Sequence, residues 1–132
     1  MKYLVDTNIL IYLMNSKSIK LQKKFTSKSI DEFGVSSITV AELIYGAKKS
    51  KAIEKNLNAA LKILSPLKVL DFTSMDAFEY GDIRADLELK GIIIGANDLL
   101  IAAQARRQNL IVLTANVKEY ERVEGLKVVN WS

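Results

Sequence analysis

The chain has 132 residues, of which 49% are hydrophobic and 26% are charged, as is usual for one folded domain. With one proline and no repeat or linker-like stretch, we expect a single domain over residues 1–132. Cysteine and histidine are absent, which excludes disulfides, thiolate zinc sites and every hydrolase mechanism that needs an imidazole. Any catalysis must therefore use carboxylates, hydroxyls, amines or a bound ion.

The N-terminal segment is apolar but does not match a signal peptide, because Asp6 and Asn8 interrupt it and no small-residue cleavage site follows. No other segment approaches the roughly 20 apolar residues that a membrane helix needs. We therefore expect a cytoplasmic protein that does not cross a membrane. The net charge of +4, from 19 Lys and Arg against 15 Asp and Glu, is too small to identify a polyanionic partner by itself.

Short apolar runs alternate with helical patterns along the chain. The first strand is expected at Tyr3–Val5, and Thr7 would cap a helix over 8–14. The further elements, in order, are a basic helix over 18–28, a strand over 33–36, a helix from Ser37 or Thr39 to Lys49, a helix over 53–64 that ends before Pro66, a strand over 68–72, a helix over 74–90 that ends at Gly91, a helix over 97–108, a strand over 111–114, a short helix around Glu119 and a strand over 127–129. Strands separated by helices predict an α/β fold with a mostly parallel sheet and helices on both faces.

Three acidic residues from distant segments are candidates for one site. Asp6 ends the first strand, at the edge where open parallel sheets bind ligands. Glu42 and Asp98 each share a helix face with apolar residues. Taken singly, Asp6 fits an ordinary N-cap, Asp98 or its neighbour Asn97 fits another, and Glu42 fits a partly exposed surface residue. Together, their repulsion would be unfavourable without a cation.

The chemistry of these acids favours a particular kind of ion. Carboxylates and water suit Mg²⁺ or Mn²⁺, and they suit zinc poorly when no His or Cys is present. Such an ion can lower the pKa of a bound water, orient the water for in-line attack on a phosphodiester and neutralise charge that develops on the phosphate. The three acids therefore predict a metal-dependent phosphodiesterase.

Two other functions place aspartates at the strand ends of a parallel sheet. A phosphoryl-transfer domain of the receiver or dehalogenase type is disfavoured, because Asp6-Thr7-Asn8 lacks the second aspartate that a dehalogenase-type phosphatase requires. A non-catalytic module that binds RNA or protein remains open. Metal dependence separates this module from a nuclease.

Four motifs in a fixed order carry a resemblance to a known family: Leu-Val-Asp-Thr-Asn at 4–8, Ser-Ser-Ile-Thr-Val-Ala-Glu-Leu-Ile-Tyr-Gly-Ala at 36–47, Ile-Gly-Ala-Asn-Asp at 94–98 and Asn-Trp at 130–131. They resemble the PIN domain and, within it, the VapC toxins of bacterial toxin–antitoxin pairs. The resemblance implies a three-layer α/β/α fold with a mostly parallel, roughly five-stranded central sheet. It also implies a Mg²⁺- or Mn²⁺-dependent endoribonuclease that leaves a 5′-phosphate and a 3′-hydroxyl.

The resemblance assigns roles to individual residues. It implies an acidic centre of Asp6, Glu42 and Asp98, with Asp6 and Asp98 as metal ligands. Many PIN domains carry Asp where Asn116 stands, and Glu119 resembles the residue that takes its place in enteric-type VapC proteins. The supporting residues would be Thr7, Asn8, Thr114 and Asn116, which orient water or carboxylates or serve simply as caps and turn formers.

The resemblance also implies partners. The substrate would be structured RNA such as a tRNA, whose cleavage inhibits translation, and the toxin would be a homodimer held inactive by a cognate VapB-type antitoxin. RNA contact is expected from a basic group, although each member alone fits a solvated surface: Lys48, Lys49, Lys51, Arg106 and Arg107. Five acids are expected on the solvent side of their helix: Asp76, Glu79, Asp82, Asp86 and Glu88.

Overall fold

Five short strands form the centre of the molecule, which the computed structural model describes over all of residues 1–132. They are β1 (Tyr3–Val5), β2 (Phe33–Ser36), β3 (Lys68–Leu70), β4 (Ile111–Leu113) and β5 (Lys127–Val129). Their order across the sheet is β3-β2-β1-β4-β5, and every neighbouring pair is parallel. The expected five-stranded parallel sheet is confirmed, with β3 ending two residues earlier than predicted.

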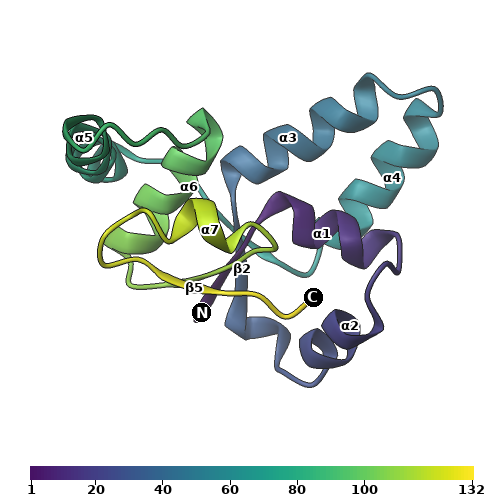
Figure 1. The fold of residues 1–132 in the computed structure, drawn as a ribbon. Helices are drawn as coiled ribbons and strands as arrows, with labels where there is room; N and C mark the ends of the chain where they lie inside the picture. The colour runs from purple at the N-terminus through teal and green to yellow at the C-terminus, as the bar shows by residue number, and fades with distance from the viewer.

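Helices cover both faces of this sheet (Figure 1). They are α1 (Thr7–Met14), α2 (Ile19–Thr26), α3 (Ser37–Lys48), α4 (Ile53–Leu64), α5 (Ser74–Leu89), α6 (Ala96–Arg107) and α7 (Val117–Tyr120), with a 3-10 turn at Ile30–Glu32. α3 and α4 pack on each other and project from the body as an arm. None of these helices has the length and apolar character needed to cross a bilayer.

The central strand contributes to both hydrophobic cores. Tyr3 and Val5 belong to one buried cluster with side chains of α1, α2 and α4, whereas Leu4 belongs to a second cluster with side chains of α5 and α6. Alternation along the strand sends neighbouring side chains to opposite faces, and a sheet covered on both faces must be apolar on both. The expected three-layer α/β/α architecture is therefore confirmed.

The strand order reverses next to β1. β2 lies next to β1, and β3 lies beyond β2 on the same side. The chain then crosses over, so that β4 lies on the other side of β1 and β5 lies beyond β4. In open parallel sheets this switch point leaves a crevice at the carboxyl ends of the two central strands, where ligands bind. The residues that follow β1 and β4 are Asp6 and Thr114.

One expected surface acid is buried. The Asp76 side chain is fully buried, accepts a hydrogen bond from the backbone N–H of Thr73 at 2.9 Å, and forms an ion pair with Arg107 of α6. Burial alone would raise the pKa of Asp76, but the Arg107 guanidinium and the Thr73 N–H hold it below its usual range. Helical periodicity placed Asp76 on the polar side of α5, but α6 packs a guanidinium against that side. The surface prediction was wrong for Asp76.

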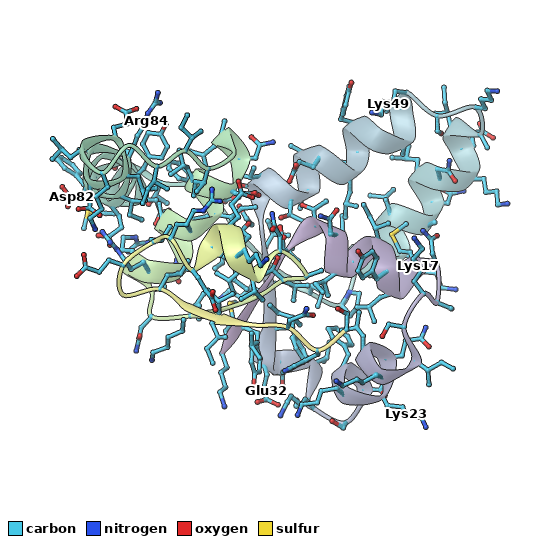
Figure 2. All side chains as sticks on the ribbon, in the orientation of Figure 1. Lys17, Lys23, Glu32, Lys49, Asp82 and Arg84 are labelled. Atoms are coloured by element: carbon cyan, nitrogen blue, oxygen red, sulfur yellow. The ribbon has the colours of Figure 1, made fainter.

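The Asp76–Arg107 pair predicts a specific loss of stability. Asp76→Asn should lower the free energy of unfolding by about 2 kcal/mol at pH 7, because it removes the charge of a fully buried carboxylate that is ion-paired with Arg107 and bonded to the Thr73 N–H. Urea unfolding measures this change. The matched control is Asp82→Asn on the exposed side of the same helix (Figure 2). Equal stability of the two variants would contradict the assigned pairing.

Candidate active site

Asp6 lies at the carboxyl end of β1, almost completely buried, with 4% of its surface exposed. Its Oδ1 accepts the N–H of Thr7 at 2.9 Å, and its Oδ2 accepts the hydroxyl of Thr114 at 2.8 Å. Asp6 is thus the N-cap of α1, and the prediction that Thr7 would cap this helix was wrong. Burial raises the pKa of Asp6 although these donors act against the rise, and the nearby Glu42 raises it further.

Asp98 and Glu119 lie together beside Asp6 and share a hydrogen bond. Asp98 is half-buried in the first turn of α6, and burial, followed by the neighbouring acids Glu119 and Asp6, raises its pKa to about 7. Glu119 accepts the N–H of Gly95 and the side-chain amide of Asn116, both at 2.7 Å. Its hydrogen bond with Asp98 is the main cause of its lowered pKa, and the Gly95 N–H lowers that pKa further. In the absence of a cation, Asp98 therefore keeps its proton at pH values below about 7, where the Glu119 carboxylate accepts it in a hydrogen bond.

The first turn of α6 differs in one detail from the prediction. Its N-cap is Gly95, which makes no side-chain capping bond, and Asn97 is exposed within the helix. Asn97 therefore does not cap α6, because the helix starts one residue before it. Asp98 turns inward, as the apolar residues on its face predicted.

Glu42 reaches the same region from α3. The Thr7 hydroxyl lies 2.6 Å from Glu42 Oε1, to which it donates, and 3.3 Å from the Thr39 hydroxyl. This contact joins the first turn of α1 to α3 across 35 positions of sequence. It leaves Glu42 Oε2 without a hydrogen bond to protein. Glu42 is half-buried.

Two of the other predicted supporting residues contact the acids. The Thr114 hydroxyl is buried between Asp6, to which it donates, and the N–H of Asn116, which it accepts at 2.9 Å. Asn116 then donates through its side chain to Glu119. Asn8 is exposed on α1 and forms no side-chain hydrogen bond, so its role stays a prediction.

Sequence analysis missed Tyr120, whose hydroxyl lies between the two central acids. The hydroxyl is 3.3 Å from Asp6 Oδ1 and 3.1 Å from Asp98 Oδ1. Burial, followed by the adjacent charges of Asp6 and Asp98, raises the pKa of Tyr120 far above neutrality, so its hydroxyl keeps its proton. A tyrosine that follows a short apolar strand looks like any core residue, and no sequence signal marked this one.

The predicted basic group separates into two parts. Lys48, Lys49 and Lys51 are exposed around the outer end of α3 and form no ion pair, and Figure 2 shows Lys49 at this end of the arm. Arg106 and Arg107 instead pair with Glu79 and Asp76 of α5. The two arginines therefore link α6 to α5, and their contact with RNA stays a prediction.

The donor set fits a hard divalent ion held partly by water. No three acidic side chains come close enough to enclose a metal by themselves. Mg²⁺, however, is usually held by one or two carboxylates and keeps several waters. Asp6 and Asp98 supply two carboxylates beside a shared hydroxyl, and no lysine or arginine donates a hydrogen bond to any of the four acids. Asp6 and Asp98 therefore have no ion pair with a cationic side chain, whereas the charge of Arg122 helps to lower the pKa of Glu119.

The raised pKa of Asp98 predicts a pH-dependent stability. Between about pH 4 and pH 7 the folded protein holds a proton on Asp98 that the unfolded chain has released, so this residue reduces stability as pH rises through that window. Asp98→Asn has no such proton to lose. In EDTA, the Tm of Asp98→Asn relative to the unmodified protein should rise between pH 5 and pH 8 by on the order of 4 °C.

Thermal unfolding followed by circular dichroism measures this difference, with Asp82→Asn as the control for loss of an exposed carboxylate. A difference in Tm that stays constant from pH 5 to pH 8, or that becomes smaller, would contradict the raised pKa of Asp98.

The chain is similar to known proteins over nearly its whole length. The profile of the PIN domain family matches residues 3–126. Ribonuclease VapC2 of Haemophilus influenzae is 42% identical over 131 residues, covering 99% of this chain and 98% of that protein. The tRNA(fMet)-specific endonuclease VapC of Salmonella typhimurium is 38% identical, with the same coverage.

Solved structures agree with these sequence relatives. DNA-bound VapBC from Salmonella typhimurium contains a chain that matches with a TM-score of 0.94 at 38% sequence identity, covering 100% of this chain and 99% of that chain. VapBC2 from Rickettsia felis, bound to a DNA fragment from its promoter, contains one with a TM-score of 0.91, also at 38% identity and with 100% of both chains covered. The chain therefore belongs to the PIN domain family, among the VapC ribonucleases.

Proposed function

We propose that this chain is a Mg²⁺- or Mn²⁺-dependent endoribonuclease that acts in the cytoplasm as the toxin of a type II toxin–antitoxin pair. The observation that carries the proposal is the pair of buried Asp6 and half-buried Asp98 at the switch point of the sheet, with no cationic side chain bonded to either. Charges arranged in this way are costly unless a cation occupies the crevice. Membership of the ribonuclease family supports the same function.

The hydrogen bonds give the four acids different roles. Asp6 and Asp98 would hold the ion, and Asp6 is fixed in position by the Thr114 hydroxyl and the N–H of Thr7. When bound, the ion supplies positive charge that stabilises the phosphate during attack and lowers the pKa of a water. Glu119 has both oxygens bonded, to Gly95 and Asn116, so its role is to position Asp98.

Glu42 is the group assigned to proton transfer. One oxygen is fixed by Thr7 and the other has no protein hydrogen bond, so it can accept a proton from the attacking water. The water oxygen bonds to phosphorus, and the bond from phosphorus to the 3′-oxygen breaks. The 3′-oxygen takes up a proton from solvent water, and Glu42 later returns to solvent the proton that it accepted. The products are a 5′-phosphate and a 3′-hydroxyl.

The substrate and partners are proposed from chemistry and from relatives together. Structured RNA is the proposed substrate, and tRNA is the specific candidate because the Salmonella typhimurium relative is named a tRNA(fMet)-specific endonuclease. Structural relatives occur as VapBC complexes. We therefore propose a cognate VapB-type antitoxin that blocks the crevice, and a homodimer as the form that it binds.

A cleavage assay tests the catalytic assignment. The protein should cut tRNA or total cellular RNA with Mg²⁺, lose activity in EDTA, and leave 5′-phosphate ends. Asp98→Asn should reduce the rate by at least about 100-fold, because it removes a metal ligand. Asp82→Asn is the control and should retain full activity. Full cleavage by Asp98→Asn would refute the mechanism, and RNA binding without cleavage by the unmodified protein would favour a non-catalytic binding module.

The lysines of the arm give a separate prediction about RNA binding. Replacing Lys48, Lys49 and Lys51 by alanine should raise the KM for RNA several-fold and weaken its dependence on salt, with kcat little changed, because these side chains would contact phosphates and no reacting group. The matched control changes the net charge equally by replacing three exposed lysines of α2: Lys20, Lys23 and Lys24. An equal effect of both triple variants would show that only net charge matters.

A further inference from the structure

Tyr120 carries a polar atom into an otherwise apolar position. The residue ends α7 and is fully buried, and its ring belongs to the hydrophobic cluster formed with α5 and α6. Only its hydroxyl leaves this cluster, and both of its hydrogen-bond partners are carboxylates of the acidic centre. The ring is thus fixed by packing, and the hydroxyl is fixed by the ring.

The contacts of this hydroxyl differ from those of an ordinary buried donor. A phenol has one proton to donate, whereas the Oδ1 atoms of Asp6 and Asp98 both face it, at 3.3 and 3.1 Å. Two carboxylates without a cation repel each other and would rotate apart. A single donor held between them by a rigid ring keeps both facing one point.

The Oδ2 atoms of Asp6 and Asp98 differ in their hydrogen bonds. Asp6 Oδ2 is held by Thr114, whereas Asp98 Oδ2 accepts no hydrogen bond from any protein donor. The rotation of the Asp98 carboxylate therefore depends on Tyr120 and on its contact with Glu119. Carboxylates that ligate metals need hydrogen bonds of this kind to keep their geometry.

We propose that Tyr120 is a positioning residue for the divalent ion: its hydroxyl aligns the Asp6 and Asp98 carboxylates so that one ion can bind both. This inference rests on the proposed function, because it requires that Asp6 and Asp98 hold a metal. Tyr120 itself touches neither RNA nor the reacting phosphate. Its packing role belongs to the ring, and its positioning role belongs to the hydroxyl alone.

Calorimetric titration with Mn²⁺ of the RNA-free protein tests the proposal. Tyr120→Phe keeps the ring and removes the hydroxyl, and it should raise the Mn²⁺ dissociation constant about tenfold. The matched control is Tyr80→Phe, which removes a hydroxyl that accepts a hydrogen bond from Arg84 outside the acidic centre. That variant should bind Mn²⁺ as the unmodified protein does.

The outcomes separate this inference from the proposed function. Equal Mn²⁺ affinity of Tyr120→Phe and Tyr80→Phe would overturn the role of Tyr120 while leaving the nuclease intact. Absence of Mn²⁺ and Mg²⁺ binding by the unmodified protein would overturn the proposed function, and the inference with it. A merely structural role would instead lower the Tm of Tyr120→Phe in EDTA and leave its Mn²⁺ affinity unchanged.

A kinetic measurement gives a second readout. In Tyr120→Phe, kcat at limiting metal should fall and should recover as the Mg²⁺ concentration is raised, with the KM for RNA unchanged. A raised KM for RNA at saturating Mg²⁺ would show that the hydroxyl contacts the substrate, and it would contradict positioning.

Discussion

Electrostatic repulsion between the buried Asp6 and the half-buried Asp98 is the constraint on which the site depends. Parallel strands bring their carboxyl ends to one edge, and the reversal of strand order beside β1 opens a crevice there. Asp6 enters this crevice from the sheet, and Asp98 enters it from a helix that packs on one face. The repulsion between these carboxylates thus lowers the stability of the fold, and it creates a negatively charged position that a divalent ion can occupy.

Neutral donors make this arrangement tolerable in the absence of an ion. The hydroxyls of Thr114 and Tyr120 and the N–H of Thr7 all bond to Asp6, and none of them neutralises its charge. A lysine or arginine in their place would satisfy the carboxylate and remove its affinity for a metal. The arginines of α6 are instead directed to α5, where they stabilise helix packing. All hydrogen-bond donors to the acidic centre are therefore neutral groups.

Much of this could be predicted from the sequence, because local patterns determine it. Apolar periodicity gave the strands and helices, and a carboxylate after the first strand indicated the edge of the sheet. The exceptions depend on contacts between distant residues. Thr7 could cap a helix as well as Asp6 can, but its hydroxyl is used by Glu42, 35 residues away. The burial of Asp76 and the direction of the Tyr120 hydroxyl likewise depend on how α5, α6 and α7 pack, which no local pattern contains.

The proposed nuclease requires that Asp6 and Asp98 share one divalent ion. A crystal structure of the protein with Mn²⁺, using anomalous scattering to locate the metal, tests this most directly. We expect one metal peak within coordination distance of both carboxylates, with waters as its other ligands. A fully occupied Mn²⁺ bound elsewhere, or a crevice that stays empty at millimolar Mn²⁺, would contradict it.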